Sequence, residues 1–367
     1  MRFGTFFLLE RPEGLDDEAV YRNSLAQVQA TEAMGYDSVW LAEHRFTEYG
    51  IMPDTMVFAA HVAATTKRIK IGTAVVVLPF HNPIRLAEQV AMVDVMSAGR
   101  YLFGVGRGYQ AGEYRGFNIP MDESRQRFNE VLDICEGLWT RDHFSYEGKF
   151  HRVDDLTIFP KPLQKPHPPV LITVMRTPES FKLAAERGYG VVSGNPYRMD
   201  PEFRESFLLY RKALEETGQA HMLDEFWALS QCFVHSDQKK AFELPRESTE
   251  SYMRAFMKHG SPKQADGKLS ADYSHYGKDW DDFLHASYEV QANSLSFLIG
   301  SPQAVVDKLG KLEEEGMKNF ILWFNRGGAI PQSDLLKSME LFAAKVMPHF
   351  AERSAKPLPA SAGGSRG

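Results

Sequence analysis

Short apolar segments rich in β-branched residues alternate with amphipathic segments along most of this 367-residue chain. Parallel strands that are buried on both faces have such continuous apolar runs, and the amphipathic segments are typical of the helices that cover them. We predict eight strands, at 3–9, 38–42, 69–78, 101–105, 170–174, 190–193, 226–235 and 320–324. We predict helices at 16–34, 56–66, 85–96, 125–140, 179–186, 202–218, 305–315 and 335–346.

This alternation favours an α/β fold in which a single (β/α)8 TIM barrel spans residues 1–350. A doubly wound open sheet is the alternative, but no GxGxxG motif opens the first helix. Two insertions interrupt the repeat, at about 142–168 and 260–290. The first contains a hairpin turn at 146–149, and we interpret the second, which is polar and aperiodic, as a mobile lid loop. We expect 351–367 to be a disordered tail.

The composition excludes several classes of function. The net charge is −6 and no dense basic cluster occurs, so we do not expect nucleic acid as a partner. No apolar run is long enough to span a membrane, and no secretory leader precedes the first strand. Cys135 and Cys232 form neither a CxxC metal site nor a disulfide framework, so we expect no metal. We therefore expect a soluble cytoplasmic protein.

Charged residues follow the second predicted strand directly. The strand 38–42 ends in Glu43, His44 and Arg45, and it would be costly to bury such charges unpaired. In a β/α barrel, the carboxyl ends of the strands carry the catalytic side chains. The triplet therefore marks a candidate active-site rim, although an ordinary ion pair or helix cap explains the local pattern equally well.

Several motifs, in the same order, resemble those of the bacterial luciferase-like flavin monooxygenases, most closely those of the catalytic luciferase subunit. They are Leu41-Ala-Glu-His-Arg-Phe-Thr-Glu-Tyr-Gly50, Gly72-Thr-Ala-Val-Val-Val-Leu-Pro79, Ser97-Ala-Gly-Arg-Tyr-Leu-Phe-Gly-Val-Gly-Arg-Gly108, Asp122-Glu-Ser-Arg125 and Val346-Met-Pro348. The resemblance covers essentially 1–350 and implies a TIM barrel.

The resemblance also implies a two-component reaction. A separate NAD(P)H:flavin reductase would supply reduced FMN, molecular oxygen would add at flavin C4a, and the hydroperoxide would oxidise an apolar small-molecule substrate. One alternative is a deazaflavin-dependent oxidoreductase on the same barrel. Another is a non-catalytic flavin-binding partner subunit, against which the presence of His44, Arg107 and Arg125 argues.

Candidate site residues follow from the same resemblance. His44 matches the family's catalytic imidazole, a group that exchanges protons near neutral pH, and Glu43 beside it is the second catalytic candidate. Arg107 and Arg125 match positions that hold the FMN phosphate, as guanidinium groups do well. The other cofactor-binding candidates are Ala74, Val75, Tyr109, Met175, Arg176, Thr177, Ser180 and Ser193.

Two features explain most of these further candidates. The residues from Met175 to Ser180 open a predicted helix, whose N-terminus attracts phosphate. Ala74 and Val75 lie where the family has a cis peptide bond against the flavin ring, and Ser193 matches a flavin-proximal position.

The chain departs from luciferase at several positions. Gly106 replaces a cysteine, Gly194 a tryptophan, and Tyr109-Gln110 a Leu-Tyr pair, so we expect a reshaped and enlarged pocket.

The resemblance also predicts how subunits assemble. The family pairs subunits through the helices after the second and third strands. This predicts a homodimer with Arg45 of one chain near Glu88 of the other, unless both residues serve their own barrel.

Overall fold

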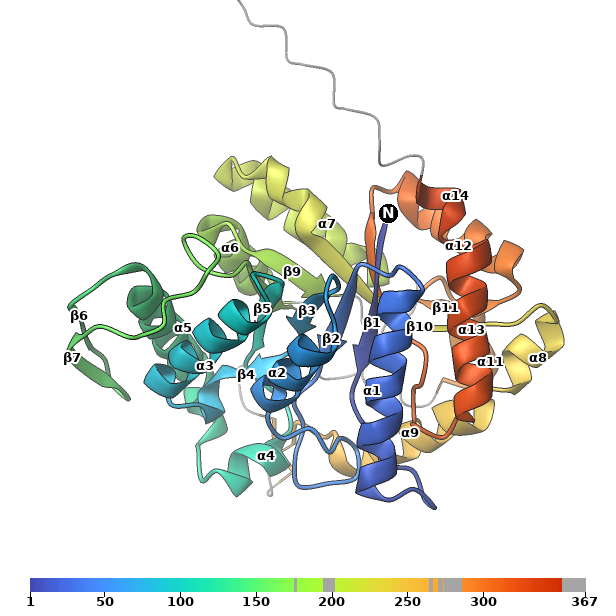
Figure 1. Ribbon diagram of the computed structural model, residues 1–367, viewed down its shortest axis with the longest axis horizontal. Helices are drawn as coiled ribbons and strands as arrows, with labels where there is room; N and C mark the ends of the chain where they lie inside the picture. The colour runs from blue at the N-terminus through green and yellow to red at the C-terminus, as the bar shows by residue number, and fades with distance from the viewer. Residues whose placement is uncertain (175–176, 194–201, 264–266, 270–272, 274–285, 352–367) are drawn as a thin grey trace, which may run out of the picture.

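A closed barrel of parallel strands forms the centre of the protein in the computed structural model, which describes residues 1–174, 177–193, 202–263, 267–269, 273 and 286–351. The barrel strands are β1 (Arg2–Phe7), β2 (Ser38–Leu41), β3 (Lys70–Thr73), β5 (Tyr101–Gly106), β8 (Val170–Thr173), β9 (Gly190–Ser193), β10 (Phe226–Val234) and β12 (Asn319–Trp323). Each pairs in parallel with the next, and β12 closes the circle by pairing with β1. The predicted (β/α)8 fold is confirmed (Figure 1).

The strands differ from the prediction in two places. The predicted strand 69–78 is divided into β3, a cis peptide bond between Ala74 and Val75, β4 (Val76–Val77) and the short 3-10 helix η1 (Leu78–Phe80). A further strand, β11 (Phe297–Gly300), pairs with the last part of β10 and was not predicted. In the first insertion, β6 (Phe144–Glu147) and β7 (Arg152–Leu156) form the predicted hairpin, which extends from one edge of the molecule (Figure 1).

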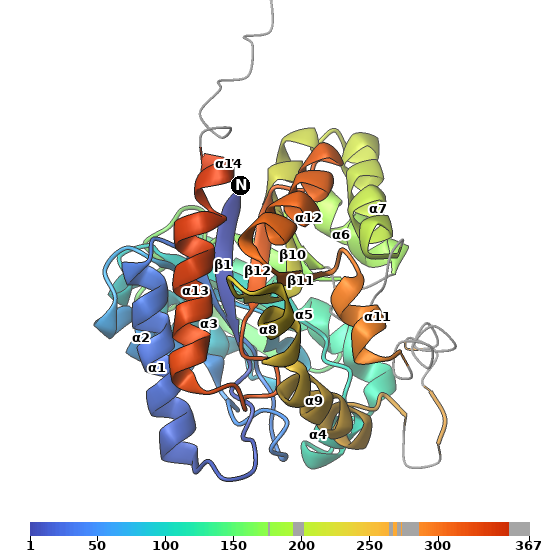
Figure 2. The same cartoon turned by 90° about the vertical axis from the view of Figure 1, so that its right-hand side faces the viewer.

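Helices surround the barrel on the outside (Figures 1 and 2). They are α1 (Asp17–Ala33), α2 (Thr55–Thr65), α3 (Pro83–Met96), α4 (Ala111–Gly116), α5 (Ser124–Thr140), α6 (Pro178–Arg187), α7 (Glu202–Thr217), η3 (Ala220–Glu225), α8 (Gln238–Glu243), α9 (Arg246–His259), α11 (Tyr288–Asn293), α12 (Pro302–Glu314), α13 (Gln332–Lys345) and α14 (Pro348–Ala351); η2 (Met121–Glu123) precedes α5. Within the described ranges, none of these helices has the length and apolar character needed to cross a membrane.

Capping side chains set several helix starts. Asp16 accepts a hydrogen bond from the backbone of Ala19 at 2.7 Å and so begins α1. Asn82 caps α3, whose first residue is Pro83, so this helix begins two residues before the predicted start at Arg85. The apolar periodicity marks the buried face of a helix, whereas the cap marks its end.

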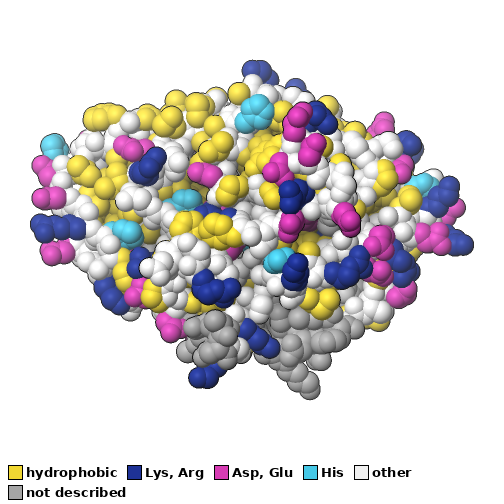
Figure 3. Space-filling model, turned by 90° about the horizontal axis from the view of Figure 1, so that it is seen from below, with side chains coloured by type: hydrophobic (Ala, Val, Ile, Leu, Met, Phe, Trp, Pro, Cys, Tyr) yellow, Lys and Arg dark blue, Asp and Glu magenta, His cyan; other side chains and the backbone are white. Residues whose placement is uncertain are grey.

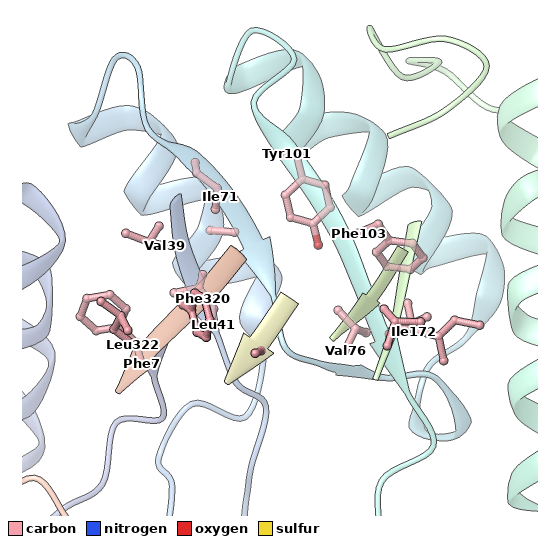
Figure 4. Close-up of a cluster of buried hydrophobic side chains, with 14 of the residues drawn as sticks. Phe7, Val39, Leu41, Ile71, Val76, Tyr101, Phe103, Ile172, Phe320 and Leu322 are labelled. Atoms are coloured by element: carbon pink, nitrogen blue, oxygen red, sulfur yellow. The ribbon is translucent and has the colours of Figure 1, made fainter. Parts of the chain in front are cut away.

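Apolar side chains fill both sides of the barrel wall. Between the strands and the helices lies a large core, part of which is drawn in Figure 4. Inside the barrel, Trp40 and Trp227 pack with their ring centroids 5.2 Å apart. A Cβ atom on Gly4 or Gly72 would come within 2.7 Å or 2.5 Å of the Trp40 ring. These two glycines therefore leave space for the Trp40 indole, which fills part of the barrel interior.

Much of the predicted lid loop lies outside the described residues, as does the tail from 352 onward. In its described part (260–263, 267–269, 273 and 286–290), Tyr273 is buried against Ala111, Tyr114 and Met121. The start of the loop is joined to α4 by a backbone hydrogen bond of 3.2 Å from Ala111 N–H to the carbonyl of Ser261.

Candidate active site

A cavity opens at the carboxyl ends of the barrel strands, the end of the molecule that Figure 3 views face on. Every predicted site residue within the described ranges lines this one cavity: Glu43, His44, Ala74, Val75, Arg107, Tyr109, Arg125, Thr177, Ser180 and Ser193. Met175, Arg176 and Gly194 lie outside the described residues. Side chains from strands that are far apart in the sequence thus converge on one site, as in other β/α barrels.

The carboxylate of Glu43 holds the chain around the cavity in place. One of its oxygens accepts hydrogen bonds from the backbone N–H of Val77 and from Nε2 of His81, both at 3.0 Å, and the other is paired with Arg45. Glu43 is 1% exposed, so these partners compensate the burial of its charge. The geometry fits an ion pair within the barrel, and Glu43 also lines the cavity.

Arg45 belongs to this same network. Besides Glu43, its guanidinium contacts the carbonyl of Pro53 at 2.6 Å and stacks over the ring of Phe117, 4.7 Å from the centroid. Arg45 thus has an ionic partner in its own barrel, which is the alternative to the contact with Glu88 of a second subunit, and that contact stays a prediction.

His44 is held by a carboxylate that the sequence analysis did not single out. Nδ1 of His44 lies 3.0 Å from Oε1 of Glu113, in α4, and the same oxygen accepts the backbone N–H of Arg45 at 3.0 Å. The side-chain amide of Gln110 lies 3.2 Å from Nδ1. An ionised carboxylate can only accept hydrogen bonds, so the Glu113 contact favours the tautomer with the proton on Nδ1, which then donates to Glu113 and does not accept from the Gln110 nitrogen, and Nε2 is left to exchange a proton with a reacting group.

Cationic and hydroxyl groups also line the cavity. Arg107 follows β5, Arg125 lies in the first turn of α5, and Thr177 and Ser180 lie at the start of α6. The Thr177 side chain accepts no hydrogen bond from the first turn of α6, although it occupies the N-cap position. The helix N-terminus and the two guanidinium groups together suit a phosphate.

Tyr273 also lines the cavity. Its ring lies 5.2 Å from the guanidinium carbon of Arg107, and its hydroxyl donates to the carbonyl of Gly108 at 2.8 Å. A residue of the second insertion thus reaches the cavity and packs on the arginine that the resemblance assigns to the phosphate.

Further groups of the cavity wall suit a flavin ring. The peptide between Ala74 and Val75 is cis. Among the described residues, the buried hydroxyls of Thr173 and Ser193 have no hydrogen-bond partner, although both residues line the cavity. Buried polar groups are nearly always satisfied, so a bound polar ligand is the natural partner for them.

The expected enlargement of the pocket at Gly106 does not occur there. A Cβ atom on Gly106 would lie 2.9 Å from the side chain of Val75, so Val75 occupies the space that the missing side chain leaves. The rest of the wall is largely apolar and was not predicted; it includes Phe6, Leu8, Phe128, Leu229 and Trp323.

Two further residues, Tyr49 and Tyr252, were also missed. Tyr49 follows His44 in the sequence, and their rings are edge to face with centroids 4.8 Å apart. The hydroxyls of Tyr49 and Tyr252 are 2.6 Å apart. The pattern around His44 contained Tyr49, whereas no local signal marks Tyr252.

Comparison with known proteins shows which family the chain resembles. The family model described as luciferase-like monooxygenase matches residues 1–319. An alkanal monooxygenase alpha chain from a Kryptophanaron alfredi symbiont is 27% identical over 364 residues, which covers 96% of this chain and 99% of that protein.

Two other proteins show similar coverage. The oxygenase component of a flavin-dependent trigonelline monooxygenase from Acinetobacter baylyi is 28% identical, with 96% of each chain covered. The crystal structure of a monooxygenase from Streptomyces bottropensis superposes with a TM-score of 0.84 at 28% identity, covering 95% of this chain and all of that one.

Proposed function

Since the chain belongs to the luciferase-like monooxygenases and is a flavin-dependent enzyme of that family, we propose that it is the oxygenase component of a two-component system. In this proposal it uses reduced FMN and molecular oxygen to oxidise an apolar small molecule. The observation that carries the proposal is the combination, in one largely apolar cavity, of the His44–Glu113 pair with Arg107 and Arg125. The His44–Glu113 pair can move a proton, and the two arginines can hold a phosphate.

The residues around the cavity fit FMN. Arg107 and Arg125, with the N-terminus of α6, would hold the phosphate, and the hydroxyls of Thr173 and Ser193 would meet polar atoms of the ring. Reduced FMN, when bound, supplies the electrons with which oxygen is activated. We assign its reduction to a separate NAD(P)H:flavin reductase, because a relative of similar length is an oxygenase component.

His44 would perform the acid–base step of the reaction. Its Nδ1 proton is held by Glu113, so Nε2 can accept or donate a proton beside the substrate. The apolar walls contributed by Leu8, Leu229 and Trp323 exclude water, which strengthens electrostatic interactions inside the cavity. Glu43 would act indirectly, by fixing the end of β4 through the backbone of Val77, directly before η1.

The proposal is tested by supplying purified protein with NADH, FMN and a separate flavin reductase, and by screening panels of apolar substrates for oxidised products. We expect product only when the reductase and FMN are both present. A parallel series with a reduced deazaflavin tests the alternative. Product formation with the deazaflavin alone would overturn the proposal.

The same proposal includes a homodimer built on α2 and α3. Large apolar side chains remain exposed on these helices, namely Val57 at 69%, Met92 at 48%, Val95 at 44% and Met96 at 52%. Such a group of exposed apolar side chains is typical of an interface.

We also assign the enzyme to the cytoplasm, where its two buried, free thiols, Cys135 and Cys232, would stay reduced.

A further inference from the structure

A second cavity lies between α1, the end of β1 and the loop that joins β12 to α13. Helices α1 and α13 run side by side next to it (Figures 1 and 2). Its volume is about 320 Å³, which is within the range of small-molecule sites. Phe6, Leu8 and Trp323 line both this cavity and the candidate active site, so they form the wall between the two. We call it the second cavity.

The charged side chains that line the second cavity are negative. Glu10 lies inside at 9% exposure, and Glu13 is at the exposed rim. Among the described residues of this wall, none is a lysine, an arginine or a histidine. The charge of Arg326 also acts on Glu10, but Arg326 is completely buried and donates to Gln231 at 2.9 Å. A cation in the second cavity would therefore meet carboxylates and no positive side chain of the wall.

The backbone around Glu10 fixes its carboxyl group. Oε1 of Glu10 accepts a hydrogen bond from the N–H of Gly327 at 3.0 Å. Leu9, directly before it, has a φ of 57°, in the left-handed region that leucine rarely adopts. Gly328 has a φ of 72°, and a Cβ atom there would lie 2.8 Å from the carbonyl oxygen of Glu10. Strained backbone of this kind is retained mainly where it positions a functional group.

The rest of the wall combines side-chain amides with hydrocarbon. Nε2 of Gln27 donates to Oε1 of Gln332 at 2.8 Å, and Nε2 of Gln332 donates to the backbone carbonyl of Asn23 at 3.3 Å. These hydrogen bonds hold the amides in place between α1 and α13. Val20 and Ile330 contribute buried apolar surface to the same wall. The second cavity thus suits a ligand with one polar end and an apolar body.

One buried oxygen of this wall awaits a hydrogen-bond donor. Asn325 lines the second cavity, and its Oδ1 has no hydrogen-bond partner within the part of the chain that the structure describes. Buried polar atoms are nearly always satisfied. A ligand that donates hydrogen bonds would satisfy this acceptor, whereas a ligand that only accepts them would not.

We propose that the second cavity is a separate ligand site, which binds a small molecule with a primary ammonium group on an apolar body. An ammonium group donates hydrogen bonds and accepts none, which complements the carboxylate of Glu10 and Oδ1 of Asn325. The apolar body would pack on Val20 and Ile330. The inference goes beyond the proposed function, because this site does not use the flavin cavity.

Two other kinds of ligand fit the second cavity less well. An anion would gain from the N-terminus of α13, which begins at Gln332, but a helix dipole amounts to only about half a charge, against the two carboxylates of Glu10 and Glu13. An inorganic cation would leave the apolar part of the wall without a partner. Both alternatives are included in the test.

Three compounds of one shape test the preference for an ammonium group: cyclohexylmethylamine, cyclohexylmethanol and cyclohexanecarboxylate. Their dissociation constants are measured by ligand-detected NMR on the full chain, with and without oxidised FMN. Burial raises the pKa of Glu10 to about 7, so the measurements are made at pH 8, where its carboxyl group is mostly ionised. We expect the amine to bind roughly five- to thirtyfold more tightly than the alcohol, which is the difference between a charged and a neutral hydrogen bond. The carboxylate should bind most weakly.

Three variants locate the effect. Glu10→Gln should abolish the preference for the amine over the alcohol and leave the affinity for the alcohol nearly unchanged. Ser24→Leu should weaken both compounds, because Ser24 is 7% exposed and lines the second cavity, so that a larger side chain fills it. Glu130→Gln is the matched control and should keep the preference: Glu130 is 8% exposed, is part of neither cavity wall, and accepts from the N–H of Phe150 at 3.0 Å. Thermal melts verify that each variant is folded.

Equal binding of the amine and the alcohol by the wild type would overturn the inference, as would a preference that survives in both Glu10→Gln and Ser24→Leu. Displacement of the amine by potassium chloride, but not by tetraethylammonium chloride at the same ionic strength, would identify an inorganic-cation site and overturn it too. The carboxylate binding most tightly would assign the site to anions instead. Because the assay needs no reductase, NADH or oxygen, its failure leaves the proposed function untouched, and a failed substrate screen leaves this inference untouched.

Discussion

Replacing Glu113 by glutamine tests the link between the carboxylate and the catalytic imidazole. The substitution keeps the side-chain shape and an oxygen that can accept from the Arg45 backbone, but it removes the negative charge next to Nδ1 of His44. Glu113 is 2% exposed and its oxygen lies 3.0 Å from Nδ1, so water does not replace the lost charge. We therefore expect folding to be retained and proton transfer to be impaired.

The magnitude follows from the type of hydrogen bond that is lost. A hydrogen bond to a charged group contributes about 1.5–3 kcal/mol, against about 0.5–1.5 kcal/mol for a neutral one. The difference of roughly 1–2 kcal/mol applies when the imidazole is charged in the transition state. It corresponds to a decrease of about five- to thirtyfold in kcat.

Two assays measure this effect. Product formation by wild type, Glu113→Gln, His44→Ala and the double variant gives a double-mutant cycle, in which the Glu113→Gln effect should vanish when His44 is absent. Nitrogen-15 NMR of labelled histidine should show the proton of neutral His44 on Nδ1 in the wild type and a mixture of tautomers in Glu113→Gln. An equal loss with and without His44, or an unchanged tautomer, would refute the coupling.

Three further predictions concern the cofactor, the stability and the assembly. Arg107→Ala should weaken FMN about ten- to a hundredfold, because it removes a charge-assisted contact to the phosphate, but should leave riboflavin affinity nearly unchanged; flavin titrations compare the two, and equal losses would contradict the assignment. Burial raises the pKa of Glu10 from 4.5 to about 7, so the carboxyl proton of Glu10 is bound more tightly in the folded state than in the unfolded chain. The protonated carboxyl therefore stabilises the fold below pH 4.5. This contribution to the free energy of unfolding, up to about 3 kcal/mol, is lost as the pH rises through 7. In denaturant melts, Glu10→Gln should not lose stability over this pH range and should be more stable than the wild type above pH 7. If the free energies of unfolding of the two proteins changed in parallel with pH, this prediction would be wrong. Met92→Lys should shift the dimer toward monomer in sedimentation experiments. Met257→Lys on α9 is the control, because Met257 has the same 48% exposure but lies outside the proposed interface, and it should not change the assembly. Identical behaviour of the two variants would argue against the α2–α3 interface.

The barrel was predictable because its signals are local. The strand at 38–42 is a continuous apolar run, and β2 occupies Ser38–Leu41 as expected. The break after Thr73 was not predictable from the residue pattern, because Ala74 and Val75 continue the apolar run of β3, and only the resemblance pointed to a cis peptide bond there. The four-residue strand β11 was missed because it is short and pairs only with the end of β10, after a long aperiodic segment.

The site was predictable where it follows a strand end or a family motif, and not where it depends on tertiary contacts. Arg107 follows β5 directly, and His44 lies three residues after the end of β2. Glu113 meets His44 across 69 residues, and Tyr252 meets Tyr49 across 203. The intrachain pair between Arg45 and Glu43 was not predictable for the same reason, since a motif does not reveal that Glu43 turns back toward Arg45.

Oxidation under oxygen-18 gas tests the central claim most directly. The enzyme is supplied with FMN, NADH and a separate flavin reductase, and the product found in the substrate screen is analysed by mass spectrometry. We predict one labelled oxygen atom in the product, only when all three components are present, and a lower yield of labelled product with His44→Ala. Product that carries no label, or labelled product formed equally well without FMN, would contradict the assignment as a flavin-dependent monooxygenase.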